Sequence, residues 1–189
     1  MKKKVLLLAM MSVMTLMVMA DEYIDPQTNV VYTYEPGQNT ASVKAGYEEV
    51  IDCGEGCEPF IELYSGSPDA VGDVVILDRF TVGSAEYVVT SIGGGAFMWN
   101  KKIKSVSIPE TVTEIGAIAF YMCNNLVAVQ LPEGLTEIAP SLFAGCSQLV
   151  SVVIPSKVST IGNNAFAGCL SLVSLTLPVG LNFAGRGAF

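Results

Sequence analysis

The fold of this chain is constrained most strongly by one spacing, a period of 23 residues that runs without insertion or deletion. The period is marked by five phenylalanines: Phe97, Phe120, Phe143, Phe166 and Phe189. Four prolines keep the same step, at Pro109, Pro132, Pro155 and Pro178. Such a period is typical of repeat proteins, in which each repeat forms one coil and buries its apolar face only against neighbouring coils. Such an architecture favours a function carried by a surface over one carried by an active-site pocket.

Each repeat unit predicts a short strand that ends at a proline. Aligned on the phenylalanine, four full units cover residues 90–112, 113–135, 136–158 and 159–181, and a partial fifth covers 182–189. The second half of each unit contains a six-residue run with apolar side chains at its first, fourth and sixth positions. This spacing predicts strands with those side chains inward at 103–108, 126–131, 149–154 and 172–177. The proline that follows each run cannot donate a hydrogen bond, so it ends the strand. The first half of each unit is expected to form a tight turn and a short helical segment.

The pattern shared by the units is T-x-I-G-x-x-A-F-x-x-C followed by L-x-x-V-x-[I/L]-P. It resembles the 23-residue leucine-rich repeats of BspA-like bacterial surface proteins over residues 90–189. The resemblance implies a leucine-rich repeat solenoid with a short parallel β-sheet, and a role in adhesion to host or neighbouring-cell macromolecules. Residues 72–76 and 87–93 are similar to the β-hairpin that precedes the first repeat in that family.

Residues 21–89 differ from the repeats and are predicted to form a β-rich N-terminal cap. They carry 14 Asp or Glu against Lys44 and Arg79, whereas residues 90–189 carry four acids and five bases. This change in composition predicts a boundary at residue 89. A cap covers the edge strand of the first coil, and its acidic side chains discourage edge-to-edge pairing. Short β-like runs in this region fall at 30–34, 41–43, 60–63, 74–77 and 87–89.

Residues 1–20 are predicted to be a secretory signal peptide. Three lysines at positions 2–4 precede an uncharged apolar run over residues 5–20. Val18, Met19 and Ala20 fit a cleavage site, which needs small residues at its first and third positions. The alternative is an uncleaved membrane anchor, but the run is shorter than the roughly 20 residues of a span. We therefore expect an exported protein, secreted or at the bacterial cell surface, without a membrane span in the mature chain.

Composition excludes several classes of function. The chain has 18 acidic and 10 basic residues, so nucleic acid is not an expected partner, because its phosphates are bound mainly by Lys and Arg. No histidine is present, which removes the commonest general base and metal ligand. A hydrolase that acts on glycans through paired carboxylates is the weakest hypothesis, because the repeats supply only four glutamates, all at turns. No enzymatic activity, cofactor or metal is expected.

Three cysteines share one position of the repeat, at Cys123, Cys146 and Cys169, and Asn100 stands there in the first unit. Thiols stacked on adjacent coils suggest a metal site or disulfides. The alternative, which we favour, is that this turn needs a small and mildly polar side chain, because a free cysteine packs like a small apolar residue.

Cys53 and Cys57 lie outside the repeats and are separated by glycines. In an exported protein they form either a small disulfide-closed loop or two free thiols, and the sequence leaves both open. The nearby acids Asp52, Glu55 and Glu58 suggest calcium, but their spacing matches no known calcium loop.

The outward positions of the predicted strands vary without harm to the coil, so they form the candidate ligand-binding face. These positions are Lys104, Ser107, Val127, Gln130, Val150, Val153, Val173 and Thr176. A shallow surface of Val, Ser and Thr suits a protein partner better than a charged small molecule. The predicted function is binding or adhesion to a surface or matrix protein, or a glycoprotein, of a host or neighbouring cell. The alternative is a structural spacer or a truncated array fragment without its own ligand.

Overall fold

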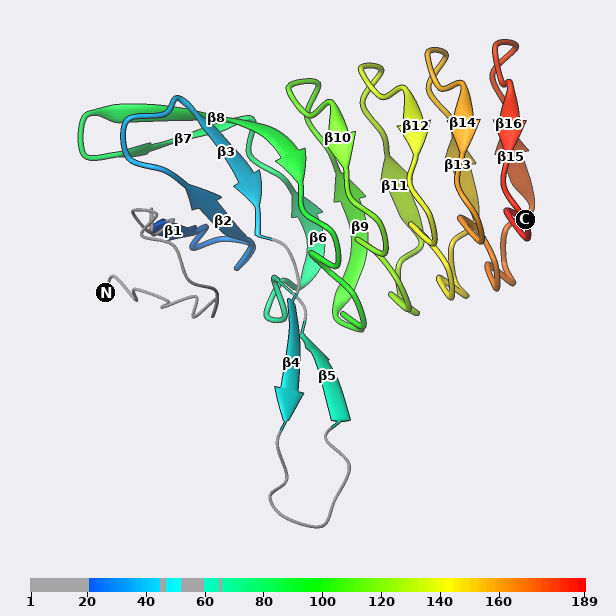
Figure 1. The fold of residues 1–189 in the computed structure, drawn as a ribbon, viewed down its shortest axis with the longest axis horizontal. Coiled ribbons are helices and arrows are strands. Elements are labelled where there is room, and N and C mark those ends of the chain that lie inside the picture. The colour runs from blue at the N-terminus through cyan, green and yellow to red at the C-terminus, as the bar shows by residue number, and fades with distance from the viewer. Residues whose placement is uncertain (1–20, 45–46, 52–59, 65) are drawn as a thin grey trace, which may run out of the picture.

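The computed structural model describes residues 21–44, 47–51, 60–64 and 66–189. These residues form sixteen β-strands and no helix, and the strands of the repeats stack as successive coils beside a group of N-terminal strands (Figure 1). Four sheets are present in the described residues, with six, five, three and two strands. The repeat protein predicted from the 23-residue period is therefore strand-rich, and its repeats pair in parallel.

The five-stranded sheet, called the repeat sheet here, runs along one side of the coils. Its register advances by one repeat from strand to strand, as in Ser105, Ala128, Ser151 and Ser174, which are successive partners. The strands are shorter than predicted because only their central residues pair. In spatial order they are β6 (Gly72–Val75), β9 (Ile103–Ser107), β11 (Ala128–Gln130), β13 (Ser151–Val153) and β15 (Ser174–Thr176).

A second line of strands, which the sequence analysis did not predict, crosses each coil at the T-x-I segment. Each strand has two residues, and the isoleucine of the first three points inward, as Ile115 and Ile138 show by their burial. Two residues are too few to give the alternating pattern by which a strand is recognised. The strands are β10 (Glu114–Ile115), which pairs with the N-terminal sheet, and β12 (Glu137–Ile138), β14 (Thr160–Ile161) and β16 (Phe183–Ala184), which form the three-stranded sheet.

The predicted helical segment in the first half of each unit is wrong for the described residues. The backbone N–H of Phe97 donates to Ala119 in the next coil at 2.8 Å, and that of Phe143 donates to Ala165 at 2.8 Å. An α-helix needs these N–H groups to bond four residues back in the same coil. Because the neighbouring coil takes the donors, the segment remains a series of tight turns.

The core of the coils is the phenylalanine stack that the period predicted. The ring centroids of successive phenylalanines lie 5.2, 5.5, 5.5 and 6.2 Å apart. The first three rings are fully buried, and the inward leucines and isoleucines of the repeat sheet pack beside them in the same cluster. Each ring covers its equivalent in the next coil, so burial depends on stacking rather than on any single repeat.

The N-terminal strands form a six-stranded sheet whose apolar side is aromatic. Tyr32, Tyr34, Phe80 and Tyr87 pack together, and the Tyr32 hydroxyl accepts a hydrogen bond from the backbone N–H of Leu77 at 2.9 Å. Burial raises the pKa of Tyr32 above its ordinary value. The strands are β1 (Asp21–Ile24), β2 (Val31–Tyr34), β3 (Thr40–Val43), β7 (Arg79–Val82) and β8 (Ala85–Ile92), followed by β10.

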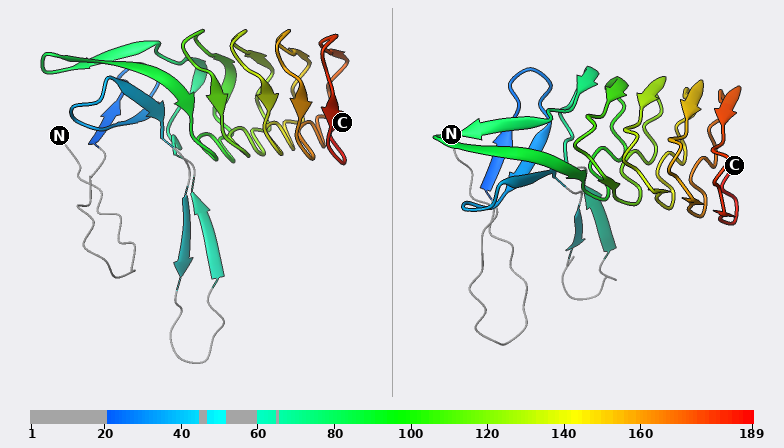
Figure 2. Two further views of the ribbon diagram at one scale, coloured as in Figure 1. Left: turned by 45° about the horizontal axis from the view of Figure 1, so that its top comes forward. Right: turned by 90° about the horizontal axis from the view of Figure 1, so that it is seen from above.

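The hairpin before the first repeat has different strands from those the sequence suggested. β8 pairs antiparallel with β7, whereas β6 pairs parallel with β9 and begins the repeat sheet. The predicted boundary at residue 89 falls inside β8, so the N-terminal region and the repeats share strands. A separate hairpin of β4 (Tyr47–Ile51) and β5 (Phe60–Tyr64) projects away from the coils (Figure 2).

Candidate binding surface

The structure brings the predicted ligand-binding residues together on the outward side of the repeat sheet. Ser107 and Gln130 are register partners, as are Val153 and Thr176, so these four residues form one column across successive coils. The other four predicted residues form a second column, in which backbone hydrogen bonds join each coil to the next. The N–H groups of Val127, Val150 and Val173 donate to the preceding residue of the column at 2.7, 3.1 and 3.0 Å, beginning at Lys104.

Among the valines of this face, exposure is greatest at Val153 and Val173. Ser107 is half-buried, whereas 67% of Val153 and 83% of Val173 are exposed. Lys104 is the only charged side chain of the two predicted columns. Over its last three strands the face is therefore uncharged, and exposed valines alternate with small or polar side chains.

Two residues of this face were missed by the sequence analysis. Asp73 and Val75 lie on β6, opposite Ser105 and Ser107. The Ser105 hydroxyl donates to the Asp73 carboxylate at 2.7 Å, and 59% of Val75 is exposed. The buried Val74 and Ile76 match the V-x-I end of the repeat pattern, which is the signal that identifies β6 as a further strand.

A shallow hollow of about 370 Å³ lies on the face, between the second and third coils. Gln130, Val153 and Ser151 line its floor, and Glu110 and Glu133 line its edge. The two carboxylates also hold the turns, because Glu110 Oε2 accepts from the backbone N–H of Glu133 at 3.0 Å. Glu133 in turn accepts from the N–H of Ser156 at 3.3 Å. These acids are thus engaged by the backbone of the next coil.

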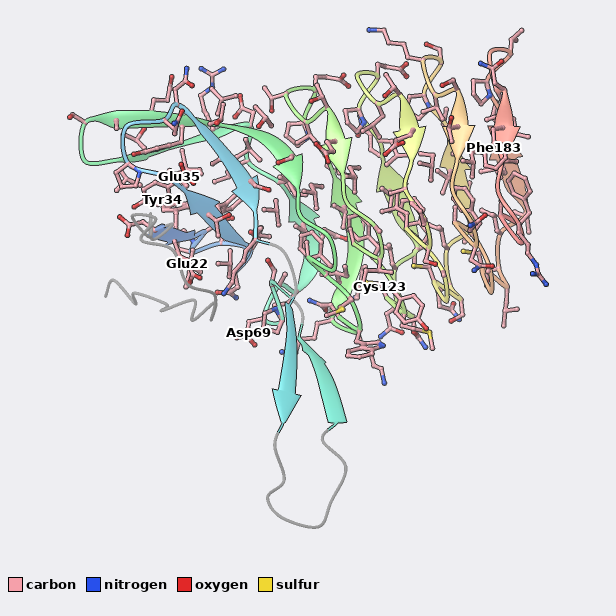
Figure 3. All side chains as sticks on the ribbon, in the orientation of Figure 1. Glu22, Tyr34, Glu35, Asp69, Cys123 and Phe183 are labelled. Atoms are coloured by element: carbon pink, nitrogen blue, oxygen red, sulfur yellow. The ribbon has the colours of Figure 1, made fainter. Side chains whose placement is uncertain are left out.

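The three cysteines that share one position of the repeat pack inside the coils, as the favoured interpretation predicted. The Cys123, Cys146 and Cys169 thiols donate to backbone carbonyls of the preceding coil at 3.0, 3.1 and 3.2 Å, and none of the three forms a disulfide. Burial raises the pKa of Cys123 to about 12 and that of Cys169 to about 11, and it also raises the pKa of Cys146. Protonated buried thiols are poor nucleophiles and poor metal ligands. Figure 3 labels Cys123 within the coils.

Asn100 performs the same task in the first coil with four hydrogen bonds. Its Nδ2 donates to the carbonyls of Ser67 and Ala70 at 3.1 and 2.9 Å. Its Oδ1 accepts from the N–H groups of Lys102 and Ile103 at 2.8 and 3.2 Å. An amide is used here because the preceding chain is not a repeat and leaves more backbone groups to satisfy.

A second hollow, of about 360 Å³, lies on the N-terminal sheet near Tyr34 and Glu35, which Figure 3 labels. Thr33 pairs with Ser42, and Ser42 pairs with Ser91, so hydroxyl groups line its floor. The Ser91 hydroxyl donates to that of Ser42 at 3.0 Å. The hollow is polar and has no cationic side chain in its lining.

The remaining predicted sites fall outside the described residues. Cys53 and Cys57, with the neighbouring acids Asp52, Glu55 and Glu58, belong to the segment 52–59. Among the residues that the structure does describe, no group of three or more His, Cys, Asp or Glu side chains is placed to hold a metal ion. In the same residues no helix is long and apolar enough to cross a membrane.

Stacked coils of 23 residues, with an L-x-x-L-x-L strand in each, define a leucine-rich repeat protein. Residues 83–189 match the model of the family described as "BspA type Leucine rich repeat region (6 copies)". This match covers more than half of the chain, and the protein belongs to that family. The resemblance noted in the repeat pattern is thereby confirmed. No curated protein sequence matches the chain.

Several solved structures are similar to this one. A leucine-rich repeat protein from Bacteroides ovatus has a TM-score of 0.66 and 27% identity, over 85% of this chain and 37% of that one. The leucine-rich repeat protein of T. pallidum has a TM-score of 0.64 and 27% identity, over 88% and 66% of the two chains. A leucine-rich cell surface protein from Faecalibacterium prausnitzii has a TM-score of 0.58 and 26% identity, over 89% and 45%. The chain thus matches between 37% and 66% of the length of these three proteins.

Proposed function

We propose that this protein is an exported leucine-rich repeat protein that binds another protein through the outward face of the repeat sheet. In this proposal residues 1–20 are a signal peptide that is removed, residues 21–89 cap the array, and residues 90–189 form the solenoid. The partner is a surface or matrix protein, or a glycoprotein, of a host or neighbouring cell. The protein acts by binding and not by catalysis.

One observation carries the proposal: exposed valines cluster on the repeat sheet. Val127, Val150, Val153 and Val173 lie on three adjacent strands or directly before them, and each is at least 40% exposed. The coil does not need them, because the same positions hold lysine, serine, glutamine or threonine elsewhere in the two columns. Contiguous exposed apolar side chains on a soluble surface mark contact sites for other macromolecules. A similar structure, that of F. prausnitzii, is described as a cell surface protein.

The experiment replaces two residues of the face with lysine. Ser107→Lys/Val153→Lys places two charges at outward positions of the alternate strands β9 and β13, so the fold is expected to be retained. Binding to a panel of purified extracellular-matrix and cell-surface proteins is measured by surface plasmon resonance. We expect the affinity for the bound panel members to fall by about tenfold or more, because a buried unpaired charge costs at least about 1.4 kcal/mol.

The matched control is Thr113→Lys/Ser159→Lys. It adds the same two charges beside the second line of strands, again two coils apart. This variant is expected to bind as the unmodified protein does, with an unchanged melting temperature. If the repeat-sheet variant binds the panel as well as the control does, the protein does not use this face, and the spacer hypothesis takes its place.

A further inference from the structure

Each coil turns through a left-handed residue just before its Asn or Cys position. In the third and fourth coils this residue is glycine, with φ of 77° at Gly145 and 74° at Gly168. In the first two coils it is Trp99, with φ of 58°, and Met122, with φ of 56°. The left-handed region disfavours every side chain with a Cβ, and bulky residues most of all. Two neighbouring coils thus carry large side chains where their sister coils show that glycine suffices.

These two residues stand on equivalent turns of adjacent coils, and both side chains are partly open to solvent. The N–H of Trp99 donates to Tyr121 at 2.7 Å and the N–H of Met122 donates to Ala144 at 2.8 Å, so the two occupy equivalent places on adjacent coils. Trp99 is 42% exposed and Met122 is 38% exposed. A Cβ on Gly145 would lie 2.3 Å from Met122 Sδ, so the methionine side chain extends across the glycine turn of the third coil.

The turn segments of the four coils carry positive charges only. Lys101 and Lys102 follow Trp99 after one intervening residue, Asn100, and are exposed. The equivalent turn segments, at residues 98–102, 121–125, 144–148 and 167–171, contain these two lysines and no acidic residue. Lys102 Nζ lies 3.2 Å from the exposed Asp69 carboxylate, a contact that solvent screens. We call Trp99, Met122, Lys101 and Lys102 the Trp99 ridge.

We propose that the Trp99 ridge is a docking surface for an acidic segment of a partner protein. Carboxylates of the segment pair with Lys101 and Lys102, and an apolar side chain between them packs on Trp99 and Met122. Backbone strain that the fold does not require, kept at exposed residues, points to a functional contact. Tryptophan and methionine are also enriched in the buried centres of protein interfaces.

Two other classes of partner fit the ridge less well. Neither of the two hollows described above includes a residue of the ridge in its lining, so neither offers the ridge a recess for a glycan. An anionic membrane would meet a chain with a net charge of −8, and two lysines supply little attraction against it. A protein segment with both carboxylate and apolar side chains satisfies every group of the ridge.

Trp99 is the single tryptophan of the chain, so its fluorescence reports on the ridge alone. A library of short random peptides displayed on phage is selected on the unmodified protein and counter-selected on Trp99→Gly/Met122→Gly. We expect the survivors to be rich in Asp and Glu around at least one apolar residue. Synthetic copies should shift the Trp99 emission to shorter wavelength, because binding removes the indole from water.

Variants separate a binding role of the ridge from a structural one. Each variant loses the packing of a half-buried side chain and gains relief from the left-handed backbone. Because glycine holds this turn in the later coils, Trp99→Gly and Met122→Gly should melt near the temperature of the unmodified protein. Calorimetric affinity for the selected peptides should fall by about tenfold in Trp99→Gly and in Lys101→Glu/Lys102→Glu, the size expected when a hot-spot residue is lost. Val153→Lys on the repeat sheet should leave it unchanged, so this test and that of the proposed function fail independently.

Three results would overturn the proposal. The first is a clear fall in melting temperature in both glycine variants, which would show that Trp99 and Met122 serve the coil. The second is a selection that gives no acidic peptides, or gives peptides that bind Lys101→Glu/Lys102→Glu equally well. The third is an emission shift produced by phosphatidylglycerol vesicles or by arrayed glycans and not by the peptides.

Discussion

Replacement of Phe143 by alanine tests whether the stacked rings hold the coils together. Phe143 is fully buried, and its ring centroid lies 5.5 Å from that of Phe120 and 5.5 Å from that of Phe166, with interplanar angles of 12° and 20°. A buried phenylalanine removes about 150 Å² from water, which at about 25 cal/mol per Å² amounts to about 4 kcal/mol. Phe143→Ala is therefore expected to lower the free energy of unfolding by about 4 kcal/mol.

Phe189 provides the matched control at the end of the same stack. Its ring has one partner, Phe166, at 6.2 Å, and 61% of the residue is exposed. About two-fifths of about 150 Å² is about 60 Å², so Phe189→Ala should cost about 1.5 kcal/mol. The difference arises because Phe143 joins two coil interfaces and Phe189 joins one, and repeat stability depends on nearest-neighbour interfaces.

The measurement is urea unfolding at equilibrium, followed by circular dichroism, of the unmodified protein and both variants. The expected order of midpoints is unmodified protein, then Phe189→Ala, then Phe143→Ala. Equal losses in the two variants would refute the reasoning, because they would show that burial in the stack does not set the stability of a coil.

Two further predictions concern the turn that follows the phenylalanine. Asn100→Ala removes four hydrogen bonds and leaves buried backbone groups unpaired, so it should lower the free energy of unfolding in urea by about 3 kcal/mol. Cys146→Ala removes one weak hydrogen bond and should lower it by about 1 kcal/mol. Equal losses in the two variants would contradict this prediction. Burial raises the pKa of Cys123 to about 12 and that of Cys169 to about 11 from 9.0, so the folded thiols stay protonated when those of the unfolded chain ionise. Stability should thus be complete below pH 9 and fall between pH 9 and pH 12. The fall near pH 10 should be about 1 kcal/mol for the buried Cys123 and less for the partly exposed Cys169, and it should be smaller in Cys123→Ala/Cys169→Ala.

The inward side of each coil was predictable from the sequence because it is set by local spacing. Leu126, Leu149 and their apolar partners three and five residues on lie on the inner side of the repeat sheet, and the phenylalanines stack in register. The packing role of the cysteine position was also predictable, because the first unit has Asn100 in place of a cysteine. An amide and a thiol share only their small size and polarity. In each case one repeat contains the whole signal, and the period repeats it.

The segments that join the array from outside it were not predictable in the same way. β6 has no phenylalanine and no following proline, so its pairing with β9 is decided by the free edge that β9 presents. β3 pairs parallel with β8 across more than 40 residues of chain and passes through a bulge between Ala41 and Ser42. The helical segment was predicted wrongly for the same reason, since its donors bond to another coil.

The sequence by itself determined the coil: its length, its buried side chains and the outward positions of its strands. The tertiary structure alone decided which edges are covered, where the second line of strands forms, and that Trp99 and Met122 adopt left-handed backbone beside two lysines. The physical reason is that side-chain burial within a repeat follows from spacing along the chain. Strand pairing, backbone strain and the grouping of exposed residues depend on neighbours in space, which the spacing along the chain does not specify.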